Sequence, residues 1–182
     1  MFWLPFCSLL GEGVYIMTTL DRCIEFLDLG RVCYAHTRHS QAFTAVEVAF
    51  AEHISPHRLA KTVVYATVQG YGLAVLPADT LINMETLGRC LNDPDIRLIS
   101  EREMLELFPE CEVGAMPPFG NLFNVPVVVD LSVAEQEFIA FNAGTHRDVL
   151  HMSYSDFARL VDPAVAKFAI TSPQHSIVEI QG

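Results

Sequence analysis

A run of ten residues, LAKTVVYATV at 59–68, limits the possible folds of this chain more than any other segment. Its β-branched and aromatic residues are typical of a strand, and Gln69-Gly70 followed by apolar residues 71–76 predicts a hairpin. Successive side chains of a strand point to opposite faces, and both faces of this run are mainly apolar. We therefore predict a central strand, with Lys61 projecting into the core or from the wall of a cavity.

Lys61 is one of only two lysines in the 182 residues. Burial of an unpaired ammonium is so costly that the group must pair with an anion, lose its proton or keep its charged end in a hydrated pocket. A functional lysine here would bind a phosphate or carboxylate, or polarise a carbonyl group. A structural lysine would extend to solvent at the end of the strand, or pair with an acid such as Glu47 or Glu52. Its position does not distinguish these alternatives.

Helices and strands alternate along the rest of the chain without a strict βαβ repeat, which favours an α+β fold with a mixed sheet. Apolar periodicity and turn residues predict a first helix that begins at Thr18 or Thr19 and has Gly30 as its C′ residue. The remaining helices are expected at about 44–53, 84–92, 100–108 and 153–161, and the remaining strands at 32–37, 96–98, 125–130, 137–142 and 148–152.

No linker or repeat divides residues 17–170, so we predict one domain there, with an N-terminal extension at 1–16 and a C-terminal tail at 171–182. The extension is apolar, but it lacks the basic start and the small-residue cleavage site of an export signal. Pro5 and Glu12 also interrupt a membrane span. An extension is therefore favoured over a cleaved or membrane-associated segment, and no membrane partner is expected.

Acidic residues outnumber basic ones, and the net charge of −11 excludes a broad basic surface of the kind that coats nucleic acid, so DNA is not an expected partner. The acidic residues are concentrated in one part of the sequence, because residues 79–112 carry a net charge of −6 whereas residues 38–70 carry a net charge of +1. Five cysteines in no C-x-x-C arrangement suit a reducing compartment, which predicts a cytoplasmic protein.

Residues 111–120, CEVGAMPPFG, must form a loop, because adjacent prolines remove two backbone donors. The loop is apolar, which is natural for one that lines a pocket. Gly114 would allow a ligand close to the backbone, and the N–H groups at 114–116 could face a carbonyl oxygen or a developing oxyanion. A stiff loop packed on the core is the equally weighted structural alternative.

Other chemistry-bearing groups are scattered. The turn at 141–146, FNAGTH, carries His146, which is either an acid–base group or simply exposed. His53 and His57 are four residues apart, but Pro56 breaks the helix that would align them, so no metal site is predicted. Cys111 would be a nucleophile only with a nearby base and a lowered pKa. The chain has no nucleophile elbow and no Walker or Rossmann glycine pattern, and no cofactor is expected.

Four segments taken together resemble the YbaK/ProX family of aminoacyl-tRNA deacylases, which is related to the editing insertion of bacterial prolyl-tRNA synthetases. The segments are AFTAVEVA at 42–49, LAKTVVY at 59–65, GAMPPFG at 114–120 and FNAGTH at 141–146, and their order and spacing match across about residues 19–162. The resemblance implies a mixed sheet curved into a partial barrel with helices around it. It also implies hydrolysis of mischarged aminoacyl esters.

The resemblance assigns catalytic roles to Lys61, Gly114 and Ala115. Backbone donors near Gly114 would stabilise the charge that develops as water attacks the ester, and Lys61 would bind a phosphate of the terminal adenosine or assist at the carbonyl. The ribose hydroxyl beside the ester would orient the water. The substrate-binding residues implied are Phe43, Thr44, Met116, Pro118, Phe119, Gly120, Asn142, Gly144, Thr145 and His146.

The resulting hypothesis is a freestanding enzyme that deacylates tRNA-Pro or a related tRNA carrying a small noncognate amino acid. Its partners would be the acceptor end of aminoacyl-tRNA and possibly an aminoacyl-tRNA synthetase. A noncatalytic module that binds aminoacyl-adenosine or a synthetase with the same pocket is one alternative. A hydrolase of small free aminoacyl esters is another.

Overall fold

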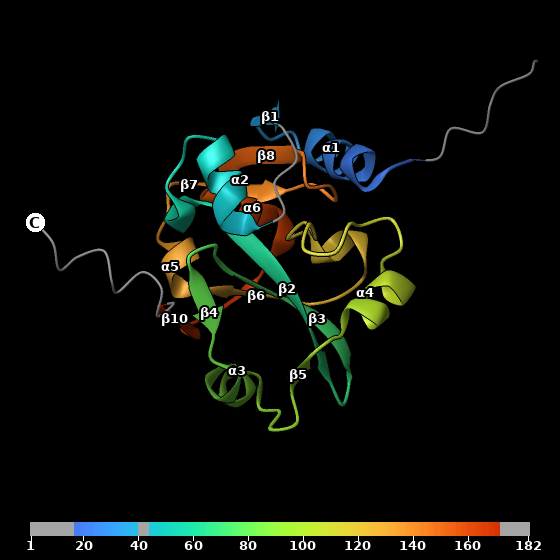
Figure 1. The fold of residues 1–182 in the computed structure, drawn as a ribbon, viewed down its shortest axis with the longest axis vertical. Coiled ribbons are helices and arrows are strands. Elements are labelled where there is room, and N and C mark those ends of the chain that lie inside the picture. Colours follow the sequence, from blue (N-terminus) through green and yellow to red (C-terminus); the bar gives the residue numbers. More distant parts are fainter. Residues whose placement is uncertain (1–16, 40–43, 172–182) are drawn as a thin grey trace, which may run out of the picture.

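A computed structural model describes residues 17–39 and 44–171 of the chain. The predicted N-terminal extension and all but the first residue of the predicted tail lie outside these ranges. Helices alternate with short strands along the chain, as Figure 1 shows. The helices are α1 (Thr19–Leu29), α2 (Ala45–Ala51), α3 (Met84–Leu91), α4 (Glu101–Leu107), α5 (Leu131–Ala134) and α6 (Tyr154–Val161), with short 3-10 turns η1 (Pro56–Arg58) and η2 (Gly120–Leu122).

The strands form three separate sheets. They are β1 (Tyr34–Arg38), β2 (Ala60–Thr67), β3 (Gly70–Pro77), β4 (Thr80–Ile82), β5 (Arg97–Leu98), β6 (Val127–Asp130), β7 (Phe138–Asn142), β8 (Asp148–Ser153), β9 (Ala164–Ala166) and β10 (Ala169–Thr171). The largest sheet has the order β5-β2-β3-β6-β9, and β1-β8-β7 and β10-β4 form the other two. None of the sheets is closed, and the α+β prediction is confirmed.

The five-stranded sheet is mixed. The hairpin β2-β3 is antiparallel with Lys61 opposite Leu76, whereas β6 pairs in parallel with both β3 and β9. Along the other edge of β2, β5 pairs with Tyr65 and Ala66. At the opposite end of β2, one parallel bridge joins Leu59 to Ala140 of β7. This bridge connects the five-stranded sheet to the three-stranded sheet.

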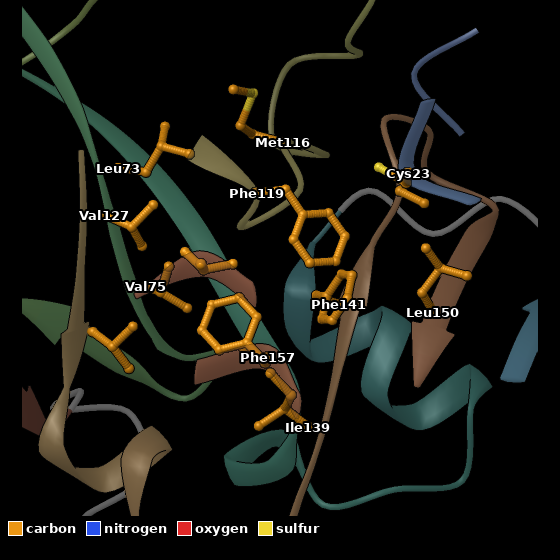
Figure 2. Close-up of a cluster of buried hydrophobic side chains, with 14 of the residues drawn as sticks. Cys23, Leu73, Val75, Met116, Phe119, Val127, Ile139, Phe141, Leu150 and Phe157 are labelled. Atoms are coloured by element: carbon orange, nitrogen blue, oxygen red, sulfur yellow. The ribbon is translucent and has the colours of Figure 1, made fainter. Parts of the chain in front are cut away.

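The largest apolar cluster fills the space where the two larger sheets face each other and are covered by α1 and α6. Phe119 is fully buried, and Figure 2 shows it beside Phe141 and Phe157. Its ring centroid lies 5.1 Å from that of Phe141 and 6.1 Å from that of Phe157. A second cluster lies beneath α2, and a third lies between β2, β3 and α3. The hairpin β2-β3 is therefore covered on both faces, as its sequence predicts.

Local sequence signals account for most helix starts. Thr18, Thr44 and Ser100 each form a reciprocal capping box with the acid three residues on. The prediction for Gly30 is corrected, because Gly30 has a right-handed φ of −70° and Arg31 takes the left-handed position at +53°. A Cβ on Gly30 would lie 2.6 Å from Cδ2 of Leu160, so α6 approaches α1 closely at this glycine.

Three short strands, β4, β9 and β10, and the one-turn helix α5 were not predicted. Three or four residues are too few to show a period, so pairing and packing decide their conformation. In the described part of the chain, no helix combines the length and the apolar character that crossing a membrane requires.

Candidate functional site

Lys61 lies near the start of β2 and is half-buried. Its side chain shares a face of the sheet with Leu59 and Tyr65, which belong to two different apolar clusters. The Lys61 Nζ donates to two backbone carbonyls, at 3.2 Å to Ala78 and 2.5 Å to Thr80. A lysine ammonium has three N–H donors. The Lys61 ammonium therefore keeps one donor for which the described residues supply no acceptor.

The charge of Lys61 is attracted by Asp79, which lies between its two carbonyl acceptors in the sequence. Burial lowers the pKa of Lys61, and the attraction of Asp79 opposes this shift. Asp79 also lies 3.4 Å from Nδ1 of His57. Neither acid suggested by the sequence is the partner, because Glu47 caps α2 and Glu52 contacts Thr37 and His151. Lys61 is therefore held in place with a weakened preference for its charged form.

Lys61 of β2 and Asn142 of β7 both follow, along the chain, the parallel bridge between Leu59 and Ala140. Each is two residues past its bridged residue, so strand alternation puts both on the side of the sheet covered by α2. Asn142 is 7% exposed, and its Oδ1 is buried without a hydrogen-bond partner. Thr44 caps the start of α2, which covers this side. The structure thus brings three of the predicted site residues to one region, and Phe43 lies outside the described residues.

The loop at 111–120 is tied to the turn that follows β7. Glu112 N–H donates to the Gly144 carbonyl, and Gly144 N–H donates to the Ala115 carbonyl, both at 2.9 Å. The Glu112 carboxylate accepts from His146 N–H at 2.6 Å. The ring Nε2 of His146 lies 2.8 Å from the Val113 carbonyl oxygen. The buried His146 therefore helps to hold the loop in one conformation.

This conformation leaves two backbone donors of the loop unused. Gly114 has a φ of +87°, a left-handed value that favours glycine. Ala115 N–H donates to the Glu112 carbonyl at 2.9 Å, which closes a turn. The N–H groups of Gly114 and Met116 find no acceptor among the residues that the structure describes. Of the three amides at 114–116, that of Ala115 is therefore used inside the loop, whereas those of Gly114 and Met116 are not.

A groove of about 190 Å³ lies beside this loop along the edge of β2. Its walls come from β2, from β5 with the start of α4, and from the loop. The lining residues are Thr62, Val63, Val64, Leu98, Ile99, Ser100, Glu101, Met104, Val113, Gly114 and Met116. Thr62, Ser100 and Glu101 are its polar members. The sequence analysis did not identify Thr62 as a site residue, although a hydroxyl inside an apolar strand was a signal in the sequence.

Several predicted substrate-binding residues have packing roles in the structure. Phe119 and Pro118 are buried, and Phe119 lies in the core rather than on a groove wall. A Cβ on Gly120 would lie 2.2 Å from the Val125 carbonyl oxygen, and one on Gly144 would lie 2.5 Å from Thr19. The Thr145 hydroxyl donates to the Asp148 carboxylate at 2.6 Å.

Other nucleophilic and metal-binding possibilities find no support in the described ranges. Burial raises the pKa of the Cys111 thiol, which lies 3.5 Å from the Thr19 hydroxyl, so this thiol is not activated as a nucleophile. Across residues 17–39 and 44–171, no group of three or more His, Cys, Asp or Glu side chains is arranged to hold a metal ion.

Comparison with known proteins gives one matching family. The family model of the aminoacyl-tRNA editing domain matches residues 39–160, which include every site residue discussed above. The chain is 27% identical over 136 residues to a proline–tRNA ligase of Pseudothermotoga lettingae. This match covers 69% of the chain and 23% of the ligase, so the chain spans about a quarter of that relative's length.

Solved structures share the fold at low sequence identity. The hypothetical protein APE2540 superposes with a TM-score of 0.75 and 20% identity, over 82% of this chain and 99% of that one. A protein described as a candidate trans-editing enzyme for prolyl-tRNA synthetase superposes with a TM-score of 0.73 and 19% identity. That match covers 86% of this chain and 99% of the other.

Proposed function

Because this chain belongs to the aminoacyl-tRNA editing domain family, we propose that it is a trans-acting hydrolase that removes amino acids from mischarged tRNA. The bond cleaved is the ester between the amino acid and the terminal ribose. The substrate is a small noncognate amino acid on tRNA-Pro or a related tRNA. The place of action is the cytoplasm, where aminoacyl-tRNA is made and used.

The observation that carries this proposal is the pair of unused amides at Gly114 and Met116. They belong to a loop that is cross-linked to the turn after β7, so they are held in position before substrate arrives. Preorganised donors aimed at a developing negative charge lower the barrier of acyl transfer, and losing one such donor costs roughly 10²–10³ in rate. The ester carbonyl oxygen would accept from these two amides.

Lys61 would contact the substrate through its third N–H. The carbonyl groups of Ala78 and Thr80 fix the other two donors, so the direction of the third is fixed as well. It would bind a phosphate of the terminal adenosine or the ester carbonyl. Asn142, whose Oδ1 has no partner, would accept from the α-ammonium or from a ribose hydroxyl.

The chemical step needs only water and the substrate's own ribose hydroxyl. Water, oriented by the hydroxyl beside the ester, adds to the carbonyl carbon and gives a tetrahedral oxyanion bound by the amides. The carbon–oxygen bond to the ribose then breaks, and the ribose oxygen takes up the proton that the water gives up. The products are the free amino acid and uncharged tRNA. Neither Cys111 nor His146 is required as a nucleophile or base.

A panel of mischarged tRNAs tests the proposal and its two alternatives. The purified chain should release the amino acid from at least one noncognate aminoacyl-tRNA and leave the cognate one intact. Saturable binding of charged tRNA without release from any member would support the noncatalytic binding module instead. Equal rates with a short aminoacyl ester and with charged tRNA would support a hydrolase of free esters.

A further inference from the structure

The groove beside the Gly114 loop is mainly apolar, and its polar side chains are Thr62, Ser100 and Glu101. The Ser100 hydroxyl is already used in the capping box of α4. Val64, Met104 and Met116 are buried residues of the main apolar cluster, and they share the walls with Ile99 and Val113. At about 190 Å³ the groove is smaller than the 300–1,000 Å³ typical of sites for drug-sized ligands. The groove therefore fits a group smaller than a drug-sized ligand, such as an amino-acid side chain.

The Thr62 hydroxyl has no structural explanation. Its Oγ1 is buried and has no hydrogen-bond partner, although buried polar groups are almost always paired. The neighbours of Thr62 on the same face of β2 are Ala60 and Val64, so a valine would match the shape and the surroundings. An unpaired buried hydroxyl destabilises the folded state. A ligand that hydrogen-bonds to Thr62 would remove this cost.

The groove adjoins the place proposed for the ester carbonyl. Gly114 and Met116 line the groove, and the same two residues carry the unused amides. In an aminoacyl ester the side chain is attached to the carbon next to the carbonyl. A carbonyl bound at these amides therefore holds the side chain at the mouth of the groove.

We propose that this groove receives the amino-acid side chain and that Thr62 makes it selective for a small hydroxyl-bearing side chain, serine or threonine, over alanine. This inference rests on the proposed function and specifies its substrate class. Rotation about χ1 of Thr62 can move its hydroxyl to the position that its methyl group now occupies, so the hydroxyl can meet one that enters the groove. An alanine side chain would leave the Thr62 hydroxyl unpaired.

The test measures kcat/KM for seryl- and alanyl-esters of the same tRNA with wild type, Thr62→Val and Thr62→Ser. Wild type should prefer the seryl-ester, and Thr62→Val should reduce the serine-to-alanine ratio about tenfold, the size of one neutral hydrogen bond. Thr62→Ser keeps the hydroxyl and should keep the preference. A wild-type preference for alanine, or a ratio unchanged in Thr62→Val, overturns the inference.

A binding measurement separates this inference from the proposed function. Seryl and alanyl amides of 3′-amino-3′-deoxyadenosine cannot be deacylated by ester hydrolysis, so calorimetry with them reports recognition alone. Preference for the seryl amide that Thr62→Val abolishes supports the groove assignment even if no tRNA is deacylated. Equal affinity for the two amides contradicts the assignment even if deacylation is fast. Circular dichroism establishes that both variants are folded.

Discussion

At the scale of single residues, the proposed chemistry depends on backbone conformation as much as on side chains. Gly114 has a left-handed φ, and a Cβ there would meet only His146 Cε1 at 3.5 Å, an ordinary contact. A substitution would therefore act through the backbone rather than through a clash. This makes Gly114 a direct probe of the two amides.

We expect Gly114→Ala to lower kcat for deacylation by roughly 10²-fold or more, because the backbone would shift to relieve about 1–2 kcal/mol of strain and turn the amides away. The matched control is Gly70→Ala, since Gly70 also has a positive φ, of 137°, but lies at the hairpin tip with nothing within 4 Å of an added Cβ. The control should lose stability and keep kcat. Equal activity of the two variants in single-turnover assays would contradict the role of the amides.

Lys61→Met should separate function from folding. Methionine retains an unbranched apolar side chain on β2, so we expect the free energy of unfolding in urea to change by less than about 2 kcal/mol. Deacylation should fall by roughly 10²-fold or more, because the donor directed at the substrate is lost. Unchanged deacylation by a folded Lys61→Met would remove Lys61 from the mechanism.

The sequence predicted the unusual setting of Lys61 but not its partners. Apolar neighbours on both faces indicated burial, which the structure confirms. Ala78 and Thr80 contribute backbone carbonyls, and no side-chain pattern reports the direction of a carbonyl group. The packing at Gly30 could not be predicted either, because its close neighbour Leu160 lies on a helix far away in the sequence.

At the scale of elements, one carboxylate connects three segments around the Lys61 side of the sheet. Asp130 ends β6 and is 2% exposed. It accepts from Ser132 N–H at 3.0 Å and from Phe168 N–H and Ala169 N–H at 2.7 Å each. These bonds hold β10, which pairs with β4, and Thr80 of β4 is a Lys61 acceptor. Asp130 is therefore a positioning residue for β4.

Asp130→Ala should lower the free energy of unfolding by about 2–4 kcal/mol, because it leaves backbone donors without an acceptor and removes the cap of α5. Hydrogen exchange of the Phe168 and Ala169 amides should increase more than that of the β2 amides. If exchange of the Phe168 and Ala169 amides increases no more than that of the β2 amides, Asp130 does not hold β10.

The pH dependence of stability provides a second readout of Asp130. Burial raises the pKa of this carboxyl, but its four hydrogen bonds outweigh burial and hold the pKa below its usual value. A carboxyl whose pKa is lower in the folded state stabilises fully above its unfolded pKa, about 3.9, and the effect is lost as pH falls through the folded pKa. Wild type should therefore lose stability more steeply than Asp130→Ala below about pH 4.

Element boundaries followed local signals where these existed. The helix starts predicted at about 44 and 100 agree with those of α2 and α4 to within one residue, and capping boxes at Thr44 and Ser100 lie there. The strands β4, β9 and β10 had no such signal, since each has three residues and forms by pairing with a distant segment. The groove at Thr62 was not predicted for the same reason, because its walls come from three segments that only the fold brings together.

At the scale of the whole molecule, the charge distribution limits how tRNA is bound. The net charge is −11, yet residues 38–70, which include Lys61, carry a local balance of +1. The acidic segment 79–112 borders this region, since Asp79 attracts the Lys61 ammonium and Glu101 lines the groove. We therefore expect few phosphate contacts.

Binding of charged tRNA should depend only weakly on salt. One or two phosphate contacts give a loss of affinity of about three- to tenfold between 50 and 200 mM salt, whereas six to ten contacts give roughly 10³–10⁵. Fluorescence anisotropy with an end-labelled tRNA measures this slope. A loss of a hundredfold or more would show an extended phosphate-binding surface and contradict acceptor-end recognition.

The most direct test of the account follows the ester bond itself. Mischarged tRNA labelled in its terminal adenosine is mixed with excess protein, and the aminoacylated fraction is measured over time against a buffer control. The account predicts rapid loss of a small noncognate amino acid in the presence of the wild-type chain, with the cognate ester left at its spontaneous rate. Loss of every ester at the spontaneous rate alone would contradict it.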